Sequence, residues 1–329
     1  QGARLGGEMI ELPGGVRIEA DLESRSARNA FARTLAGRRL REGRYLRGAF
    51  YLGSKLFYDW LGTLEGEAFD GLSMTRVSDI NQLYGGRETL DALQRREARF
   101  FNTCMIATAL GAAASDALED GRVVSGVGGQ YNFVAMAHAL RDGRSVLLLR
   151  ARRGDESNIR WNYGYTTIPR HLRDVYVTEY GVADLRGKSD EDCVRAMLAI
   201  TDARFIDSLV AEAQRARKLP QDFAVPDRWR ENTSQRLALT LTPWRDKFPE
   251  FPFGSDFDAV ERRLLPALQW IRRRSATFGG RLLLVLAALT SPACETAILA
   301  RLGLDAPRGV GERFLRRLVA RAVAATAEG

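Results

Sequence analysis

The chain has 329 residues, of which 45% are hydrophobic and 27% charged, a balance that excludes a disordered polypeptide, a collagen-like repeat and a small disulfide-rich fold. The formal net charge is +8, but only four of the 49 basic residues are lysines, an arginine bias typical of a GC-rich genome. The three cysteines are scattered, which favours a reducing compartment, and the longest apolar run, residues 282–289, is much shorter than a bilayer span. Residues 1–17 lack a hydrophobic leader, so we expect a cytoplasmic protein with no membrane partner.

Residues 1–44 form a lead-in segment without an evident core of its own. Residues 15–21 have the pattern of a short edge strand, and residues 25–39 have the pattern of a helix. We therefore expect a short N-terminal lead-in and not an independent domain.

Strand and helix patterns alternate in residues 45–218. The predicted strands are residues 45–52, 100–109, 122–125, 145–149 and 174–178, and the predicted helices are residues 88–99, 132–140 and 189–200. Ser189 suits the N-cap of the last helix because its hydroxyl oxygen can accept a hydrogen bond from a first-turn N–H. Short apolar strands that alternate with helices indicate an α/β domain.

Residues 219–329 have the pattern of a proline-marked linker followed by a helical tail. Residues 261–274 and 312–325 have the pattern of amphipathic helices, and an apolar segment, residues 281–289, lies between them. From Asp256 onward the chain has 12 arginines and 7 acidic residues, so this tail holds most of the net positive charge. Because the arginines lie in helical sequence and not on an aromatic-studded sheet, they favour a solvated or partner-facing surface over a nucleic-acid interface.

The sequence lacks the residues that several common kinds of catalytic and binding site need. The two histidines, His138 and His171, have no cysteine or carboxylate partners at zinc-like spacing, so we predict neither a metal site nor a histidine-based triad. No G-x-S-x-G motif is present. Tyr131 replaces the third glycine of a dinucleotide-binding loop, and Val182 stands where a Walker A loop needs glycine. Carboxylates, backbone amides and small polar side chains remain as the groups that could carry out chemistry.

A glycine cluster joins a predicted strand to a predicted helix, in residues 125–133 with the sequence Ser-Gly-Val-Gly-Gly-Gln-Tyr-Asn-Phe. Glycines let a ligand approach the backbone closely, and successive N–H groups at a helix N-terminus can hold an anion or a developing oxyanion. Gln130 is placed to hydrogen-bond beside them. A tight turn that needs positive φ is the structural alternative.

Two further polar residues follow apolar strand patterns. Glu179, in the run Val-Thr-Glu-Tyr-Gly-Val-Ala-Asp, lies between a predicted buried strand and a glycine turn, where site residues of α/β sheets are found. Asn81 follows an apolar strand pattern, and its amide can position a ligand there. The alternatives are a surface carboxylate near Arg170 or Arg173 for Glu179, and a turn cap for Asn81.

These segments, in this order, resemble the C-terminal domain of the acetyl-CoA hydrolase/transferase family, which includes acetyl-CoA hydrolases, 4-hydroxybutyrate CoA-transferases and succinyl-CoA:acetate CoA-transferases. The resemblance spans about residues 45–213. Residues 49–58 are similar to the family's Phe–Gly-Ser–Tyr element, and residues 125–133 to its G-x-G-G-Q-x-D-F motif, with Asn132 in place of aspartate. Residues 157–159, 166–170 and 177–189 resemble further family elements.

The resemblance implies an α/β domain of the NagB/RpiA/CoA-transferase-like three-layer type, with an appended C-terminal helical segment. It implies that a glutamate carboxylate attacks an acyl-CoA thioester, and that a glutamyl-CoA intermediate passes CoA to a carboxylic acid or to water. Coenzyme A would then be a substrate, and no bound cofactor is implied. Such an enzyme needs an oxyanion hole and a pocket for the acyl group and CoA.

The resemblance also implies roles for individual residues. The backbone N–H groups of Gly128 and Gly129 would stabilise the oxyanion. Gln130, Asn81 and Glu179 match positions that line the acyl and CoA pocket. The positions implied to contact CoA are Gly126, Val127, Gly128, Gly129, Ser157 and Asn158.

Family enzymes also have an N-terminal half that completes the CoA cleft. We therefore expect the chain to be the C-terminal part of an enzyme that works with such a half or with a second copy. The family's nucleophilic glutamate lies in a Glu-Met dipeptide, which Glu8 provides in different surroundings, so Glu8 is a hypothetical nucleophile whose alternative is an exposed carboxylate near a turn. A non-catalytic CoA-binding or regulatory relative is the alternative function, and nucleic-acid binding by the tail is the least favoured one.

Overall fold

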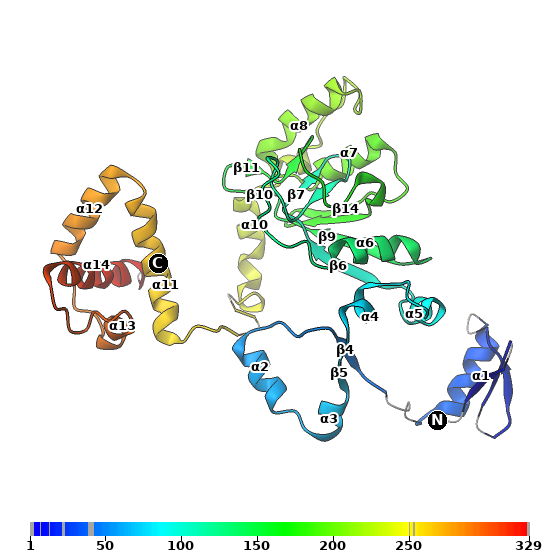
Figure 1. Cartoon of the computed structure of the whole chain (residues 1–329). Coiled ribbons are helices and arrows are strands. Elements are labelled where there is room, and N and C mark those ends of the chain that lie inside the picture. The colour runs from blue at the N-terminus through cyan, green and yellow to red at the C-terminus, as the bar shows by residue number, and fades with distance from the viewer. Residues whose placement is uncertain are drawn as a thin grey trace. The chain divides into compact units, whose positions relative to one another are not determined.

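The structure is a computed structural model that describes residues 3–6, 8–12, 14–21, 24–38, 43–249, 251–252 and 254–327. The chain forms two units, which we describe separately (Figure 1). The first contains Gln1–Tyr51 and Gly66–Phe248, and the second contains Leu52–Glu65 and Pro249–Gly329. The predicted boundaries after residues 44 and 218 stay predictions. No helix in the described ranges is both long enough and apolar enough to cross a bilayer.

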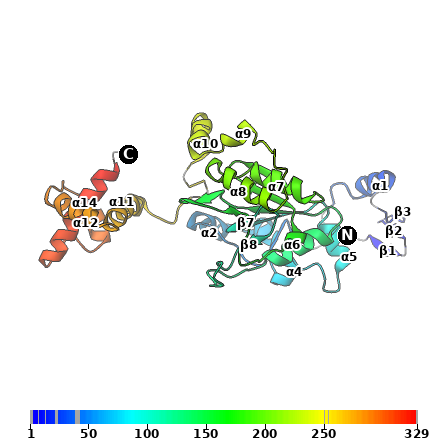
Figure 2. The same cartoon turned by 90° about the horizontal axis from the view of Figure 1, so that it is seen from above.

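The N-terminal segment forms a small antiparallel sheet with one helix beside it (Figure 2). Its elements are β1 (Arg4–Gly6), β2 (Met9–Glu11), β3 (Arg17–Glu19) and α1 (Arg25–Leu35). β3 is an edge strand, as the pattern of residues 15–21 predicts. Ser24 caps α1 by accepting a hydrogen bond from the N–H of Ala27. Arg39, the predicted end of this helix, lies outside the described residues.

The central sheet of the first unit has four strands in the order β14-β13-β9-β6. They are β6 (Arg99–Thr103), β9 (Arg144–Leu148), β13 (Val175–Thr178) and β14 (Gly181–Asp184). β6, β9 and β13 are parallel, and β14 returns antiparallel to β13. Leu147 pairs with Asn102 on one side and with Tyr176 on the other, so the carboxyl ends of the three parallel strands lie at one edge.

Helices cover this sheet and complete the main core. The three helices are α6 (Gln130–Ala139), α7 (Asp190–Leu198) and α8 (Ala203–Arg215). α6 contacts β6 and β9, whereas α7 contacts β14 and lies beside α8 in both views (Figures 1 and 2). Leu147 and Tyr176 of the sheet are buried in one cluster with Met197 of α7 and Ile206 of α8. The predicted α/β class is therefore confirmed, and the three-layer type stays a prediction.

The remaining elements of the first unit are short. They are β4 (Leu46–Gly48), α3 (Gly66–Asp70), β5 (Leu72–Met74), α4 (Val77–Asn81), α5 (Glu88–Gln94), β7 (Ile106–Thr108), β8 (Ala113–Ala114), β10 (Arg152–Arg153), β11 (Glu156–Ser157), β12 (Ile159–Arg160), η1 (Arg170–Leu172), α9 (Asp227–Arg230), α10 (Ser234–Leu241) and η2 (Thr242–Lys247). β4 pairs with β5, β10 pairs with β11, and β12, β7 and β8 form a small sheet.

The second unit is helical. Its helices are α2 (Lys55–Gly62), α11 (Ala259–Ser275), α12 (Phe278–Leu289), α13 (Thr296–Arg301) and α14 (Val310–Ala327). A capping box of Asp258 and Glu261 starts α11, and Leu264, Ile298 and Val323 pack in the core of the unit. The predicted helices 261–274 and 312–325 lie within α11 and α14 and are confirmed, and the apolar segment 281–289 lies within α12.

Several predicted strands are wrong in detail. The predicted strand 100–109 is two strands, because the N–H of Cys104 donates to Leu148 of the central sheet, whereas the N–H of Met105 donates to Ala114 of the small sheet. Residues 122–125 form no strand, since the N–H groups of Val124 and Ser125 both donate to the carbonyl of Asp116.

A buried carboxylate connects the first residues of β9 and β13. Asp174 is 2% exposed, and its carboxylate accepts hydrogen bonds from the backbone N–H of Ser145 at 2.7 Å, from Arg144 at 2.8 Å and from Arg186 at 2.5 Å. A buried charge with several donors on it is costly to break, because the donors lose their partner inside the protein.

We expect Asp174→Asn to lower the free energy of unfolding by about 3 kcal/mol, since it leaves two arginines without their buried anion. Chemical denaturation followed by circular dichroism measures this loss. Asp184→Asn is the matched control, because Asp184 pairs with the same Arg144 but has a side chain that is 49% exposed, and it should cost less than about 1 kcal/mol. Equal losses in the two variants would contradict the role of Asp174.

Candidate active site

The carboxyl edge of the parallel strands brings several predicted site residues together. Thr103 ends β6, Leu148 ends β9 and Thr178 ends β13, and the segments that follow these strands lie at the same edge of the sheet. Ligands of α/β sheets bind outside this edge, because loops diverge there and leave space between them. The predicted residues are placed around it as follows.

The glycine cluster ends in the N-terminus of α6. Gly129 is the N-cap of this helix, and no side chain caps it. Gly128 has a φ of +58°, which favours glycine, so the tight turn with positive φ, the structural alternative, is present in this segment. In the described part of the chain, the N–H groups of Gly128 and Gly129 donate to no protein acceptor. Two backbone donors at a positive helix end are therefore available to an anion.

Asn81 packs directly against this loop. A Cβ atom built on Gly129 would lie 2.9 Å from Nδ2 of Asn81 and 3.1 Å from the ring of Phe133. Asn81 is buried and is the last residue of α4, so the prediction that it follows a strand is wrong. A hydrogen bond of 2.5 Å between Thr75 and Asp79 lies at the start of this helical turn. The structure nevertheless brings Asn81 into contact with the glycine cluster, while their shared role in a site stays a prediction.

Gln130 is buried at the first position of α6 and connects this helix to β6. Its Nε2 atom donates to the carbonyl oxygen of Thr103 at 2.8 Å. Its Oε1 atom is buried without a partner in the described residues. An unsatisfied buried acceptor costs about 1–3 kcal/mol, so a donor from a water molecule or a ligand would stabilise this side chain.

Glu179 lies in the exposed turn between β13 and β14. One carboxylate oxygen accepts a hydrogen bond from the backbone N–H of Ala151 at 2.8 Å. Glu179 therefore connects this turn to the segment after β9, and neither Arg170 nor Arg173, its hypothetical partners, has an ion pair with it.

Ser157 is the last residue of β11, and Asn158 directly follows it. The Ser157 hydroxyl donates to the carbonyl of Ile159 at 2.6 Å. The Asn158 side chain donates to the carbonyl of Arg150 at 2.9 Å, and its backbone N–H donates to the carbonyl of Ala151. Asn158 and Glu179 thus both bind residues 150–151, which brings them near each other.

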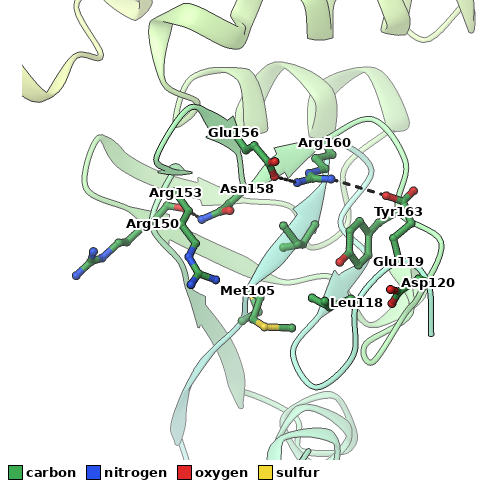
Figure 3. Close-up of a pocket in the computed structure, with 12 residues that line it drawn as sticks. Met105, Leu118, Glu119, Asp120, Arg150, Arg153, Glu156, Asn158, Arg160 and Tyr163 are labelled. Carbon is green, nitrogen blue, oxygen red and sulfur yellow. Dashed lines mark hydrogen bonds and ion pairs between the residues drawn. The ribbon is translucent and has the colours of Figure 1, made fainter. Parts of the chain in front are cut away.

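A cavity of about 590 Å³ opens beside Asn158 (Figure 3). Arg160 lies between Glu156 at 2.9 Å and Glu119 at 3.8 Å, with its guanidinium over the ring of Tyr163. Arg150 and Arg153 extend on the other side of this cavity, and within the described ranges neither has a carboxylate partner. These two arginines were not predicted, although the run Arg150–Arg153 directly after a buried strand was a usable signal.

Glu8 is exposed in the turn between β1 and β2. The backbone carbonyl of Glu8 accepts a hydrogen bond from the N–H of Ala20. Among the described residues, no recorded contact joins Glu8 to the glycine cluster or to Glu179. The structure therefore does not bring Glu8 together with the other predicted residues.

Burial raises the pKa of the thiols of this chain. Cys104 is among the residues that line the cavity, and burial raises the pKa of its thiol to about 12. Burial also raises the pKa of Cys193 and of Cys294. Within the described ranges no three histidine, cysteine or acidic side chains are grouped to hold one metal ion.

Comparison with known families finds a match over the part of the chain that contains most of the predicted site residues. Residues 53–213 match the sequence profile of the acetyl-CoA hydrolase/transferase C-terminal domain. This segment contains the glycine cluster, Asn158 and Glu179, and it is the part of the chain that matches that C-terminal domain.

Two curated relatives are CoA-transferases. The chain is 32% identical over 116 residues to the 4-hydroxybutyrate coenzyme A transferase of Clostridium kluyveri, an alignment that covers 34% of this chain and 27% of the relative. It is 26% identical over 174 residues to the probable butyrate:acetyl-CoA coenzyme A-transferase of Syntrophomonas wolfei, covering 51% of this chain and 36% of the relative. The chain thus spans about a third of the length of the curated relatives it matches.

Solved structures give partial overlaps. RipA of Yersinia pestis is 24% identical with a TM-score of 0.44, covering 52% of this chain and 37% of RipA. A 4-hydroxybutyrate CoA-transferase of Porphyromonas gingivalis is 23% identical with a TM-score of 0.39, and the overlap covers 52% of this chain and 37% of that structure.

The close approach of Asn81 to the glycine cluster is testable by substitution. We expect Gly129→Ala to lower the free energy of unfolding by about 1–3 kcal/mol, because the new methyl group displaces Asn81 or Phe133. Gly126→Ala is the control, since open space surrounds its Cβ position, and it should cost less than about 1 kcal/mol. Chemical denaturation of both variants measures the difference, and an equally small loss in both would contradict the packing described.

Proposed function

We propose that this chain is the C-terminal part of a CoA-transferase or acyl-CoA hydrolase that moves CoA between a short acyl-CoA and a carboxylic acid or water. The family match of residues 53–213 carries this proposal, and the two free N–H groups of Gly128 and Gly129 support it. The three-layer fold type, a cytoplasmic location, and a partner that is either an N-terminal half or a second copy belong to the same proposal.

Coenzyme A is the proposed substrate, and its charges suit the cavity beside Asn158. CoA carries a diphosphate and a ribose phosphate, and arginine is the side chain best suited to bind phosphate. Arg150 and Arg153 extend from the cavity without carboxylate partners in the described part of the chain. Gly126 and Val127, which are exposed beside the α6 N-terminus, together with Ser157, would position the rest of CoA.

The proposed reaction is covalent catalysis by a glutamate. A carboxylate oxygen attacks the thioester carbonyl carbon, the C–S bond breaks, and an acyl-glutamyl anhydride and CoA thiolate form. The thiolate then attacks the glutamyl carbonyl, and the acyl group leaves as a carboxylate, so that glutamyl-CoA remains.

A second half-reaction regenerates the enzyme. An acceptor carboxylate attacks glutamyl-CoA and expels the thiolate, which takes the acyl group from the new anhydride and restores the glutamate. When water attacks instead, glutamate, CoA and a proton result. The N–H groups of Gly128 and Gly129 would bind the oxyanion of each tetrahedral intermediate. Glu8 and Glu179 are the candidate nucleophiles, and Gln130 and Asn81 would position the acyl group.

A chemical trap identifies the nucleophile. Acyl-CoA is added to the full chain, alone and with the N-terminal half of a relative, and borohydride then reduces a glutamyl thioester to an alcohol. Peptide mass mapping should find one glutamate that has lost one oxygen and gained two hydrogens. Modification at Glu8 or Glu179 assigns the nucleophile, and the absence of any reduced glutamate under both conditions would reject the glutamyl-CoA intermediate.

A non-catalytic CoA-binding or regulatory relative is the alternative function. The observation that favours it is the exposed position of Glu8, which no contact among the described residues joins to the glycine cluster or to Glu179. Calorimetry would then show CoA binding, while a panel of short acyl-CoAs shows neither transfer nor hydrolysis with any added half. Measurable turnover would reject this alternative.

The role of the two free arginines has its own test. We expect the double variant Arg150→Gln with Arg153→Gln to weaken CoA binding at least tenfold, roughly the value of one lost charge-assisted phosphate contact. Binding of pantetheine, which lacks the phosphates, should not change. Calorimetry measures both affinities, and Arg228→Gln on α9 is the control for an exposed arginine outside the cavity. Equal losses for CoA and pantetheine would contradict phosphate binding by these arginines.

A further inference from the structure

A second cavity, of about 370 Å³, lies at the amino ends of the parallel strands and not at the edge that carries Glu179. The C-terminal part of α6, the turn η1 and the loop between β14 and α7 surround it. Its basic lining residues are His138, Arg170, His171, Arg173, Arg186 and Lys188. Both histidines of the chain therefore line one cavity.

Cations outnumber carboxylates around this cavity. Asp190 pairs with three cations, Arg170, Arg173 and Lys218. These pairs lower the pKa of the Asp190 carboxyl to about 2, with the hydrogen bond from Lys218 as the largest cause. Lys188 lines the cavity as a further cation.

A second group of ion pairs, around Asp174 and Asp184, is also rich in arginine. Asp174 and Asp184 share Arg144, and Asp174 also pairs with Arg186. The ion pairs of Asp174, Asp184 and Asp190, counted together with Lys188, contain three carboxylates and six cationic side chains. The cations are Arg144, Arg170, Arg173, Arg186, Lys188 and Lys218. An excess of like charge in one place repels itself and attracts a multivalent anion.

Some of the basic side chains that line this cavity are free to bind a ligand. In the described part of the chain, the Lys188 ammonium and the His171 ring have no recorded side-chain partner. Arg170 reaches Asp190 only at 3.5 Å, and its side chain is 57% exposed. His138 makes a hydrogen bond of 2.9 Å to the carbonyl of Leu172, and burial followed by the charge of Arg186 lowers its pKa. These groups provide donors that the protein itself does not saturate.

We propose that this cavity binds a phosphate group, free or as a phosphate monoester of a small metabolite, at a site separate from that of CoA. A phosphate dianion offsets most of the excess charge, and its oxygens accept hydrogen bonds from arginine, lysine and histidine donors. The cavity volume lies at the lower end of the range for small-molecule sites. This proposal does not rest on the proposed function.

The two histidines allow a direct test. Because the chain contains no others, the ring signals of histidine-labelled full-length protein form two sets, and His171→Gln assigns them. Inorganic phosphate is titrated at constant pH, with sodium chloride at matched ionic strength as the reference. We expect saturable shifts of both ring signals with phosphate and not with chloride. Shifts that are absent, or equal in chloride, would overturn the proposal.

Substitution of the free cations separates a binding site from a purely structural ion-pair network. The double variant Lys188→Gln with Arg170→Gln should weaken phosphate binding at least tenfold while the midpoint of thermal unfolding stays within the error of the wild type. Lys247→Gln, at an exposed lysine outside the cavity, is the matched control and should bind as the wild type does. Unchanged affinity in the double variant would overturn the proposal.

Two further titrations distinguish the source of the phosphate and the identity of the site. Ribose 5-phosphate that binds more tightly than inorganic phosphate would support a monoester, whereas tighter binding of inorganic phosphate would support the free ion. CoA should leave both histidine signals unchanged. If CoA shifts them and competes with phosphate, the cavity belongs to the CoA site and the proposal of a separate site fails, while the proposed function stands.

Discussion

The arrangement of the candidate site depends on the buried carboxylate of Asp174. It holds the backbone N–H of Ser145 and the side chains of Arg144 and Arg186, and so connects the beginnings of β9 and β13. Once the beginnings of two parallel strands are joined, the register fixes where their carboxyl ends lie. The contact of Glu179 with Ala151 at the opposite edge is a consequence of that register.

Local sequence patterns were sufficient to predict the elements whose structure depends on residues close by in the chain. Ser189 caps α7 as predicted, with its hydroxyl oxygen accepting from the N–H of Asp192, because an N-cap depends on residues within one turn. Residues 145–149 differ by one residue from β9, since a continuous apolar run is a strong strand signal. The glycine cluster and Asn81 were predicted as parts of one site through the family resemblance, and they do lie in contact.

Other features depend on distant residues and could not be predicted. The break at Cys104 occurs because two different sheets supply the acceptors for consecutive N–H groups, and no local pattern contains that choice. The basic cavity combines His138 of α6 with His171 of η1 and Lys188 before α7, and only tertiary structure brings these segments together. Two charged turns that look like ordinary solvated surface in the sequence thereby form one electrostatic feature.

The burial of the cysteines has a practical consequence for solution studies of the protein. Cys104 and Cys193 are buried, which shields their thiols from alkylating reagents, whereas Cys294 is partly exposed. A cysteine introduced at exposed Val127 would therefore accept a fluorescent label in preference to Cys104 and Cys193. The chain is thus suited to a reporter beside the α6 N-terminus once Cys294 alone is replaced.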